Sequence, residues 1–151
     1  MPLGTIFSDL IDETITQLKA NITELADDGA EPRIKKWMGT KRLQKGEFYA
    51  EVKAGPMEPI DGRTTHATNN LFTVIVDLIY ASTATEGFES GFDIAMGVAQ
   101  QIYDLFHITN NMNGLVRQCL VSIFPGDGDI QGSLLAIPIR CTITCERIVV
   151  Q

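Results

Sequence analysis

The segment 133–150, SLLAIPIRCTITCERIVV, most constrains the fold, because apolar and polar residues alternate along it with a period of two. Such alternation predicts a long β-strand with one buried face. Pro138 cannot donate a hydrogen bond to a neighbouring strand, which predicts a sheet edge or a bulge at that position. The expected buried face consists of Leu135, Ile137, Ile139, Cys141, Ile143 and Cys145, and the opposite face of Ala136, Pro138, Arg140, Thr142, Thr144 and Glu146.

Three further segments have the pattern of strands. Residues 47–54, EFYAEVKA, alternate and predict a half-buried strand, and residues 115–124 predict a strand that precedes the C-terminal one. Residues 71–82, LFTVIVDLIYAS, are apolar at nearly every position, which predicts a central strand covered on both faces. Asp77 interrupts this run, and we interpret it as a carboxylate at a strand end or a subunit edge.

Two segments have a helical period, since their apolar residues recur at three- and four-residue steps: 5–27 and 86–108. Thr5 would cap the first helix, and Thr83 with Glu86 would form a capping box for the second. The order α-β-β-α-β-β predicts an α+β fold, with a mixed, mainly antiparallel sheet of about four to five strands packed against two main helices. A chain of 151 residues fits a single domain, 1–151.

Charge is distributed unevenly along this chain, whose formal net charge is -7. Residues 1–31 carry seven acids and one lysine, whereas the segment 33–46, the basic arm, carries six basic residues and no acid. A single basic strip on an acidic protein makes a poor general nucleic-acid binder but can dock onto an acidic neighbour. Trp37 either covers the core edge from a solvated loop, anchors the arm on another subunit, or contacts nucleic acid. The interface candidates here are Arg33, Lys35, Lys36, Trp37, Lys41, Arg42 and Lys45.

Two polar segments predict loops, 55–70 and 125–132. Loops as long as the first are often functional, and its interface candidates are Asp61, Arg63 and His66. The second contains Asp127 and Asp129 at positions 1 and 3 of an EF-hand calcium loop. Position 12 is Pro138 instead of glutamate, and a strand follows instead of a helix, so we interpret the segment as a turn that offers both aspartates for contacts. We expect no metal and no cofactor.

Catalytic motifs are absent from the sequence: it contains no phosphate-binding glycine loop, no HExxH, no GxSxG and no dinucleotide fingerprint. We therefore do not expect an enzyme. The alternative from a different class is a small enzyme or ligand-binding domain, which would need Asp77, His66 or Cys119 to converge in a cleft. Cys119, Cys141 and Cys145 predict buried free thiols, with a disulfide from Cys119 to one of the others as the alternative across a hairpin.

Two features of the sequence predict that the chain is synthesised in the cytoplasm. No apolar run reaches the roughly 18 residues that a bilayer requires, and the first residues, MPLGTIFSDLIDE, carry acids where a secretory signal carries positive charge. We expect no membrane partner.

The chain resembles the tail terminator (tail completion) proteins of long-tailed bacteriophages. The resemblance lies in an N-terminal amphipathic helix, EFYAEVKA leading through a long loop into LFTVIVDLIYAS, a helix of the GFDIAMGVAQQIYDLF kind, and a C-terminal hairpin ending in TITCERIVV. It spans nearly the whole chain and is one of order, length and pattern.

The resemblance implies a structural virion protein without catalytic residues, which assembles as a ring, commonly a hexamer. Such a ring caps the tail tube, ends tail polymerisation and forms the joint to the head connector. The implied partners are other copies of the chain, the tail tube protein and a connector or neck protein, and the implied location is the tail or neck of the virion. Genome DNA would pass through the lumen without sequence-specific recognition. Another phage neck or baseplate adaptor is the neighbouring alternative.

Overall fold

The computed structural model describes residues 2–27, 32–36, 44–59, 67–83 and 86–150 of the chain. Two α-helices, one short 3-10 helix and six strands lie within these ranges, which confirms the α+β class. In chain order the elements are α1 (Leu3–Asn21), η1 (Thr23–Leu25), β1 (Ile34–Lys36), β2 (Phe48–Pro59), β3 (Ala67–Thr83), α2 (Gly87–Phe106), β4 (Gln118–Pro125), β5 (Asp129–Gln131) and β6 (Leu134–Val150).

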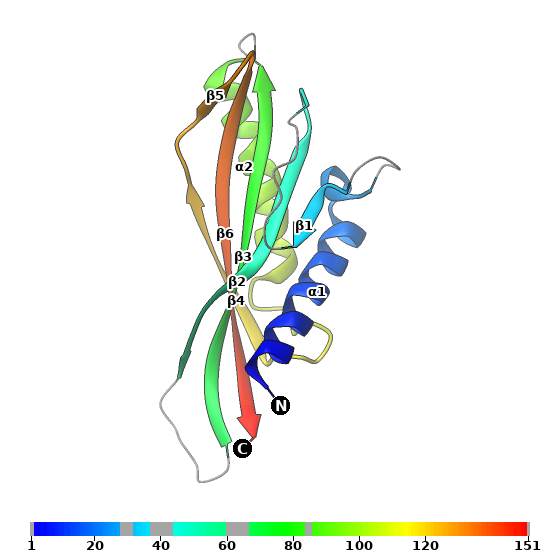
Figure 1. Ribbon diagram of the computed structural model, residues 1–151, viewed down its shortest axis with the longest axis vertical. Coiled ribbons are helices and arrows are strands. Elements are labelled where there is room, and N and C mark those ends of the chain that lie inside the picture. The colour runs from blue at the N-terminus through cyan, green and yellow to red at the C-terminus, as the bar shows by residue number, and fades with distance from the viewer. Residues whose placement is uncertain (1, 28–31, 37–43, 60–66, 84–85, 151) are drawn as a thin grey trace.

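The strands form one mixed sheet in which the long strands β3 and β6 run side by side along the molecule (Figure 1). The strand order is β1-β2-β3-β6-β4, and β5 pairs with β6 beyond the end of β4. β1 runs parallel to β2, and the other pairings are antiparallel. The described sheet is larger than predicted, because β1 and β5 are short strands in segments that we expected to be loops.

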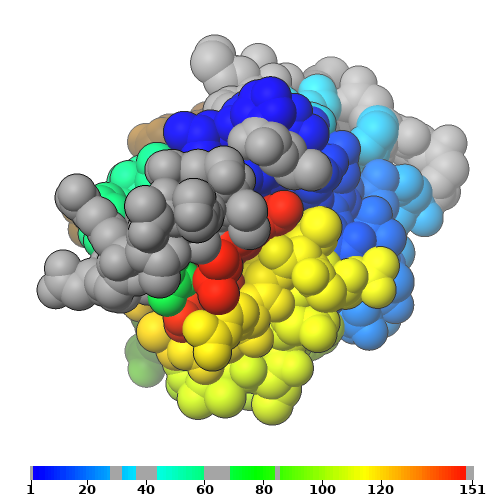
Figure 2. Space-filling model, turned by 90° about the horizontal axis from the view of Figure 1, so that it is seen from below, coloured from blue at the N-terminus to red at the C-terminus, as the bar shows by residue number. Residues whose placement is uncertain are grey.

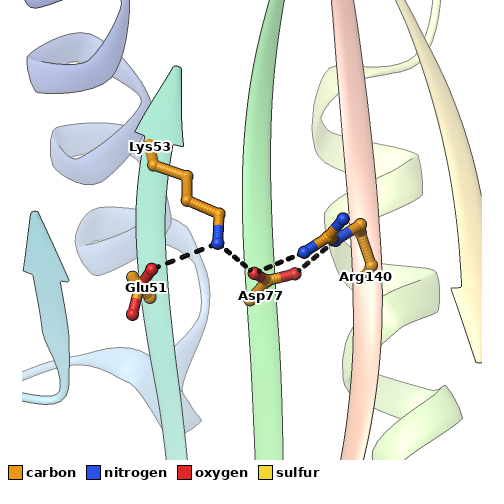
Figure 3. Close-up of polar contacts among 4 residues, drawn as sticks. All are labelled: Glu51, Lys53, Asp77 and Arg140. Atoms are coloured by element: carbon orange, nitrogen blue, oxygen red, sulfur yellow. Dashed lines mark hydrogen bonds and ion pairs between the residues drawn. The ribbon is translucent and has the colours of Figure 1, made fainter. Parts of the chain in front are cut away.

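Both helices pack on one face of the sheet, as Figure 3 shows with α1 and α2 behind the strands. Alternation along each strand places the remaining side chains on the opposite face, the open face, which no helix of the described chain covers. On this face Ile75, Asp77 and Ile79 of β3 are partly exposed, so the prediction that both faces of this strand are covered is wrong. The buried strand residues facing the helices include Val52, Phe72, Val74, Val76, Leu78, Ile137, Ile139, Cys141, Ile143 and Cys145.

Helix α1 begins and ends earlier than predicted. It starts at Leu3, after an extended Pro2 that makes no side-chain cap, so Thr5 lies inside the helix. It ends at Asn21, and the chain then forms η1, which buries Leu25. The apolar period continues through this break because the 3-10 turn keeps the same side of the chain against the core.

Helix α2 approaches the sheet closely at Gly91. A Cβ atom at this position would lie 2.6 Å from Ile137 Cδ1 and 2.7 Å from Ser82 Oγ. At the start of the helix the Glu86 N–H donates to Thr83 Oγ1 at 3.2 Å, which is half of the predicted capping box. The Glu86 carboxylate instead accepts a hydrogen bond from the Ser82 hydroxyl at 2.8 Å. This contact joins the start of α2 to the end of β3.

The turn after α2 closes one end of the core. Figure 2 views this end, where α1 (blue), the segment after α2 (yellow) and the end of β6 (red) lie together. Met112 is fully buried in this turn, and Asn110 donates a hydrogen bond to Gln17 of α1. The predicted exit turn at 110–114 therefore also connects the two helices.

Pro138 lies in the interior of the sheet and not at its edge, because β6 pairs with β3 on one side and with β4 and β5 on the other. Its carbonyl accepts a hydrogen bond from the Gly126 N–H at 2.9 Å, so the backbone at this residue points towards the β4 side. On that side β4 pairing ends at Ile139 and β5 pairing begins at Ala136. Pro138, which has no backbone N–H to donate, therefore lies at the gap between the two partner strands β4 and β5.

The two predicted loops are shorter than expected. β2 extends to Pro59 and β3 begins at Ala67, so parts of the segment 55–70 belong to strands. In the segment 125–132, Asp129 begins β5, and the tight reversal into β6 follows at Gly132, whose φ is 64°. Asp127 and Asp129 are both exposed.

Candidate functional site: the open face of the sheet

Four charged residues form a row across three neighbouring strands on the open face (Figure 3). Glu51 of β2 pairs in register with Asp77 of β3, which pairs in register with Arg140 of β6. Lys53 lies two residues after Glu51 and therefore on the same face. Residues that are far apart in the sequence are thus brought together by strand register alone. We call these four residues the charged row.

Asp77 is the centre of the charged row. Arg140 donates two hydrogen bonds to it, from Nε to Oδ1 at 2.8 Å and from the guanidinium to Oδ2 at 3.1 Å. Lys53 Nζ lies 2.9 Å from Asp77 Oδ2 and 3.3 Å from Glu51 Oε1. The two hydrogen bonds from Arg140 to Asp77 fix the orientation of the guanidinium and of the carboxylate, which are both planar.

The titration of Asp77 follows from these contacts. Partial burial alone would raise its pKa, but the hydrogen bonds from Arg140 and Lys53 outweigh burial, and the pKa of Asp77 lies below its ordinary value. The same contacts raise the pKa of Lys53 and of Arg140. A carboxylate held in the ionised form is a weak general base at neutral pH. The charged row is therefore suited to orienting side chains and not to transferring protons.

The charged row borders a concavity of about 530 Å³ on the open face. Its lining contains four cationic side chains, two acidic ones, and no histidine, cysteine or serine. A cationic hollow on an acidic protein favours acidic groups of a partner. We call this hollow the basic concavity; its lining residues are Arg33, Lys35, Tyr49, Ala50, Glu51, Lys53, Asp77, Leu78, Ile79, Gly126, Gln131, Pro138, Ile139 and Arg140.

One wall of the basic concavity contains a second charged cluster. Arg33 lies 3.0 Å from Glu47 and 5.8 Å above the centre of the Tyr49 ring. The Tyr49 hydroxyl donates a hydrogen bond to Glu47. Burial, together with this contact, raises the pKa of Tyr49 to about 12. Arg33 is thus committed to its own chain, whereas Lys35 makes no ion pair in the part of the chain that the structure describes.

The basic arm is partly a strand and partly neutralised within the protein. Residues Ile34–Lys36 form β1, and Lys36 Nζ lies 2.8 Å from Asp12 of α1. The charge distribution in the sequence suggested that the basic arm docks onto an acidic neighbour. In the described structure part of this complementarity lies inside one chain. Lys45 is exposed.

The other interface candidates fall outside the described residues: Trp37, Lys41, Arg42, Asp61, Arg63 and His66. Asp127 and Asp129 are exposed near β5, and the neighbouring Gly126 and Gln131 line the basic concavity. Among the residues described, no group of three His, Cys, Asp or Glu side chains is placed to hold a metal ion.

The convergence required for a small enzyme does not occur for the two of its residues that are described. Asp77 points to the open face, whereas Cys119 is fully buried on the helix side of the sheet. Asp77 itself lies in the middle of β3, so the expected position at a strand end is wrong, and the alternative position at a subunit edge stays a prediction.

The three cysteines are buried free thiols, as predicted. Cys119 and Cys145 face each other across β4 and β6, with 3.6 Å between their sulfur atoms. Burial raises the pKa of Cys141 to about 12. These thiols are therefore parts of the core.

Sequence reasoning missed Glu51, Lys53 and Arg140 as site residues. Each was assigned to the polar face of its strand, which was the available signal, but the register that brings them to Asp77 was unknown. His107 also connects elements: its Nδ1 accepts a hydrogen bond from the Val121 N–H at 3.0 Å, which links the end of α2 to β4.

No described helix is long and apolar enough to cross a membrane. No family model matches the chain, and no curated protein matches it. Among solved structures, one match covers 95% of this chain and 95% of the other at 19% sequence identity, with a TM-score of 0.43. At this TM-score the similarity carries no argument about function.

Proposed function

We propose that this chain is a structural subunit of a bacteriophage tail, which assembles with copies of itself into a ring, most simply a hexamer. The ring caps the tail tube, ends tail polymerisation and forms the joint to the head connector. This proposal rests on the sequence resemblance to tail terminator proteins, and the open face of the sheet supports it.

The observation that carries the proposal is the chemistry of the open face. It combines a wide concavity with charges that already orient each other, and the described lining of this concavity contains no histidine, cysteine or serine. Such a surface can recognise a partner because its side chains lose little freedom on binding.

Exposed apolar side chains extend the open face beyond the basic concavity. Leu120 and Phe124 of β4 lie on it, since they pair in register with Thr144 and Arg140 of β6. They are 45% and 56% exposed. Large apolar residues beside oriented charges are typical of surfaces that bind proteins.

Negative-stain imaging of the protein mixed with purified tail tubes tests the proposal. We expect rings at one end of the tubes and no further tube growth. A variant with Lys35, Lys41 and Arg42 changed to glutamate, which leaves the Lys36–Asp12 pair intact, tests the basic arm. Weaker capping would support a contact role for the arm, and unchanged capping would remove it from the mechanism. Bare tube ends with the unmodified protein would contradict the proposal.

The volume of the basic concavity favours one second candidate, a binding domain for a small anionic ligand. Its volume of about 530 Å³ lies in the range of small-molecule sites. A thermal-shift screen with carboxylates and phosphates distinguishes the two candidates. The ring proposal predicts no saturable stabilisation by small anions, whereas the second candidate predicts one that Lys53→Ala abolishes.

A further inference from the structure

The outer face of α2, which we call the acidic face, carries exposed acids near both ends of the helix. The helix contains Glu89, Asp93 and Asp104, which are all exposed, and no lysine or arginine. Glu89 and Asp93 make no hydrogen bond or ion pair within the described chain, and they line a shallow hollow at the start of the helix. Their side chains are therefore available to a partner.

Gly97 lies in the middle of this acidic face, and no contact within the described chain requires a glycine at this position. It is exposed, its backbone is helical, and a Cβ atom there would have no neighbour within 4 Å. A glycine inside a helix costs about 1 kcal/mol relative to alanine. Gly91, on the inner face of the same helix, is explained by its contact with the sheet. A close approach by another molecule would explain Gly97 in the same way.

The acidic face of α2 and the basic concavity point in opposite directions. α2 covers the helix side of the sheet, and the concavity opens on the other side. Two complementary surfaces on opposite sides of one chain cannot bind each other within that chain. They can bind head to tail between copies, which is the arrangement that produces rings when the rotation closes.

The two surfaces also correspond in size. Glu89 and Asp104 are 15 residues apart on the helix, which is about 22 Å. The basic concavity crosses five strands, β1, β2, β3, β6 and β5, and adjacent strands lie about 4.8 Å apart, so it is about 19 Å wide plus the reach of its long side chains. A helix with side chains is about 10–12 Å across.

We propose that α2 of one copy packs into the basic concavity of the next copy, with Glu89 and Asp93 facing the cationic lining and Gly97 permitting close contact. This interface rests on the proposed ring and specifies which surfaces form it. Lys35 is the cation best placed to attract the acids of α2, because it lines the concavity and makes no ion pair in the described chain.

Charge-reversal substitutions on the two surfaces test this interface. The readout is the concentration at which the assembly dissociates, measured by sedimentation velocity at low salt. We expect the variant Glu89→Lys with Asp93→Lys to raise this concentration by about tenfold or more, and Lys35→Glu to raise it by a smaller factor. Combining the three changes should recover part of the loss. Glu24→Lys, an exposed reversal on η1, serves as the control and should leave assembly unchanged.

Gly97→Gln gives a test that does not depend on charge. Glutamine is a good helix former and meets no neighbour within its own chain, so the protomer should fold normally. We expect its assembly to weaken by about tenfold or more because the added side chain separates the two surfaces.

The outcomes separate this inference from the ring proposal. If the unmodified protein forms rings and the α2 and Gly97 variants assemble as well as it does, the interface is wrong and the ring stands. If the α2 variants lose only tube binding, the acidic face meets the tube protein, and the interface is again wrong. A protein that stays monomeric at every concentration contradicts both.

Discussion

At the scale of single residues, the open face is organised around Asp77. Its carboxylate accepts hydrogen bonds from Arg140 and Lys53, and Lys53 also contacts Glu51. The row links three strands through their side chains, in addition to the backbone ladder. Contacts within the row lower the pKa of Asp77 and raise the pKa of Lys53 and of Arg140, so these three groups keep their charges.

Asp77→Asn should destabilise the protein by about 1 kcal/mol at pH 7, since the pair is partly exposed and screened by solvent. The pKa of Asp77 is lower in the folded protein than in the unfolded chain. Its stabilising contribution is therefore present above about pH 4 and is lost as the pH falls through the folded-state pKa. Urea unfolding of both proteins from pH 7 to pH 2 should show their difference shrinking in acid.

Glu24→Gln is the matched control for this prediction, because Glu24 is an exposed acid without a partner in the described chain and lies outside the proposed interface. It should leave the unfolding free energy within about 0.5 kcal/mol of the original. A difference between Asp77→Asn and the original protein that stays constant down to pH 2 would show that the ion pairs do not hold the Asp77 charge.

Tyr49→Phe should change stability mainly in alkali. The folded-state pKa of Tyr49 is about 12, above the ordinary tyrosine value. The phenol therefore stabilises the fold fully below about pH 10, and this contribution is lost as the pH rises towards 12. The original protein should lose more stability than Tyr49→Phe between pH 10 and pH 12. Phenolate absorbance near 295 nm gives a direct reading, and Tyr49 ionisation close to pH 10 would contradict the assignment.

At the scale of elements, α2 carries two glycines with different environments. Gly91 faces the sheet, where a methyl group would collide with Ile137 and Ser82, whereas Gly97 faces open space. Gly91→Ala should therefore destabilise the protein by about 1–3 kcal/mol, and Gly97→Ala should stabilise the isolated protomer by up to about 1 kcal/mol. Chemical unfolding at the lowest practical protein concentration measures both. Equal effects of the two changes would mean that the side of α2 facing the sheet is misassigned.

The sequence predicted the elements better than their ends and pairings. The alternation in 133–150 identified β6 and its buried face correctly, and the apolar period located both helices. β1 and β5 were missed because each has only three residues, too few for a period to emerge. The turn formers in 55–70 suggested a loop, but pairing with long neighbours extended β2 and β3 into it.

The candidate site could be predicted only in part, for a physical reason. Sequence spacing shows which side chains share a face of one strand, but it does not fix which strands are neighbours or in what register. Lys53, Asp77 and Arg140 meet through two separate pairings, one of them between residues 63 positions apart. The Lys36–Asp12 pair was missed for the same reason, since it depends on how α1 packs beside β1.

At the scale of the whole molecule, one face of the sheet holds the core and the other carries the basic concavity, while α2 presents acids on the far side. The presence of a basic surface on one side and an acidic surface on the other fits a subunit of a head-to-tail assembly. Charges without an ion pair in the described chain lie on both of these surfaces: Lys35 in the basic concavity, and Glu89 and Asp93 on α2.

The mass of the pure protein in solution tests this account most directly. Light scattering coupled to gel filtration, across a hundredfold range of protein concentration at low salt, should show an assembly of several copies. Six copies of the 16.6 kDa chain would give about 100 kDa. A single species of 16.6 kDa at every concentration would contradict the account.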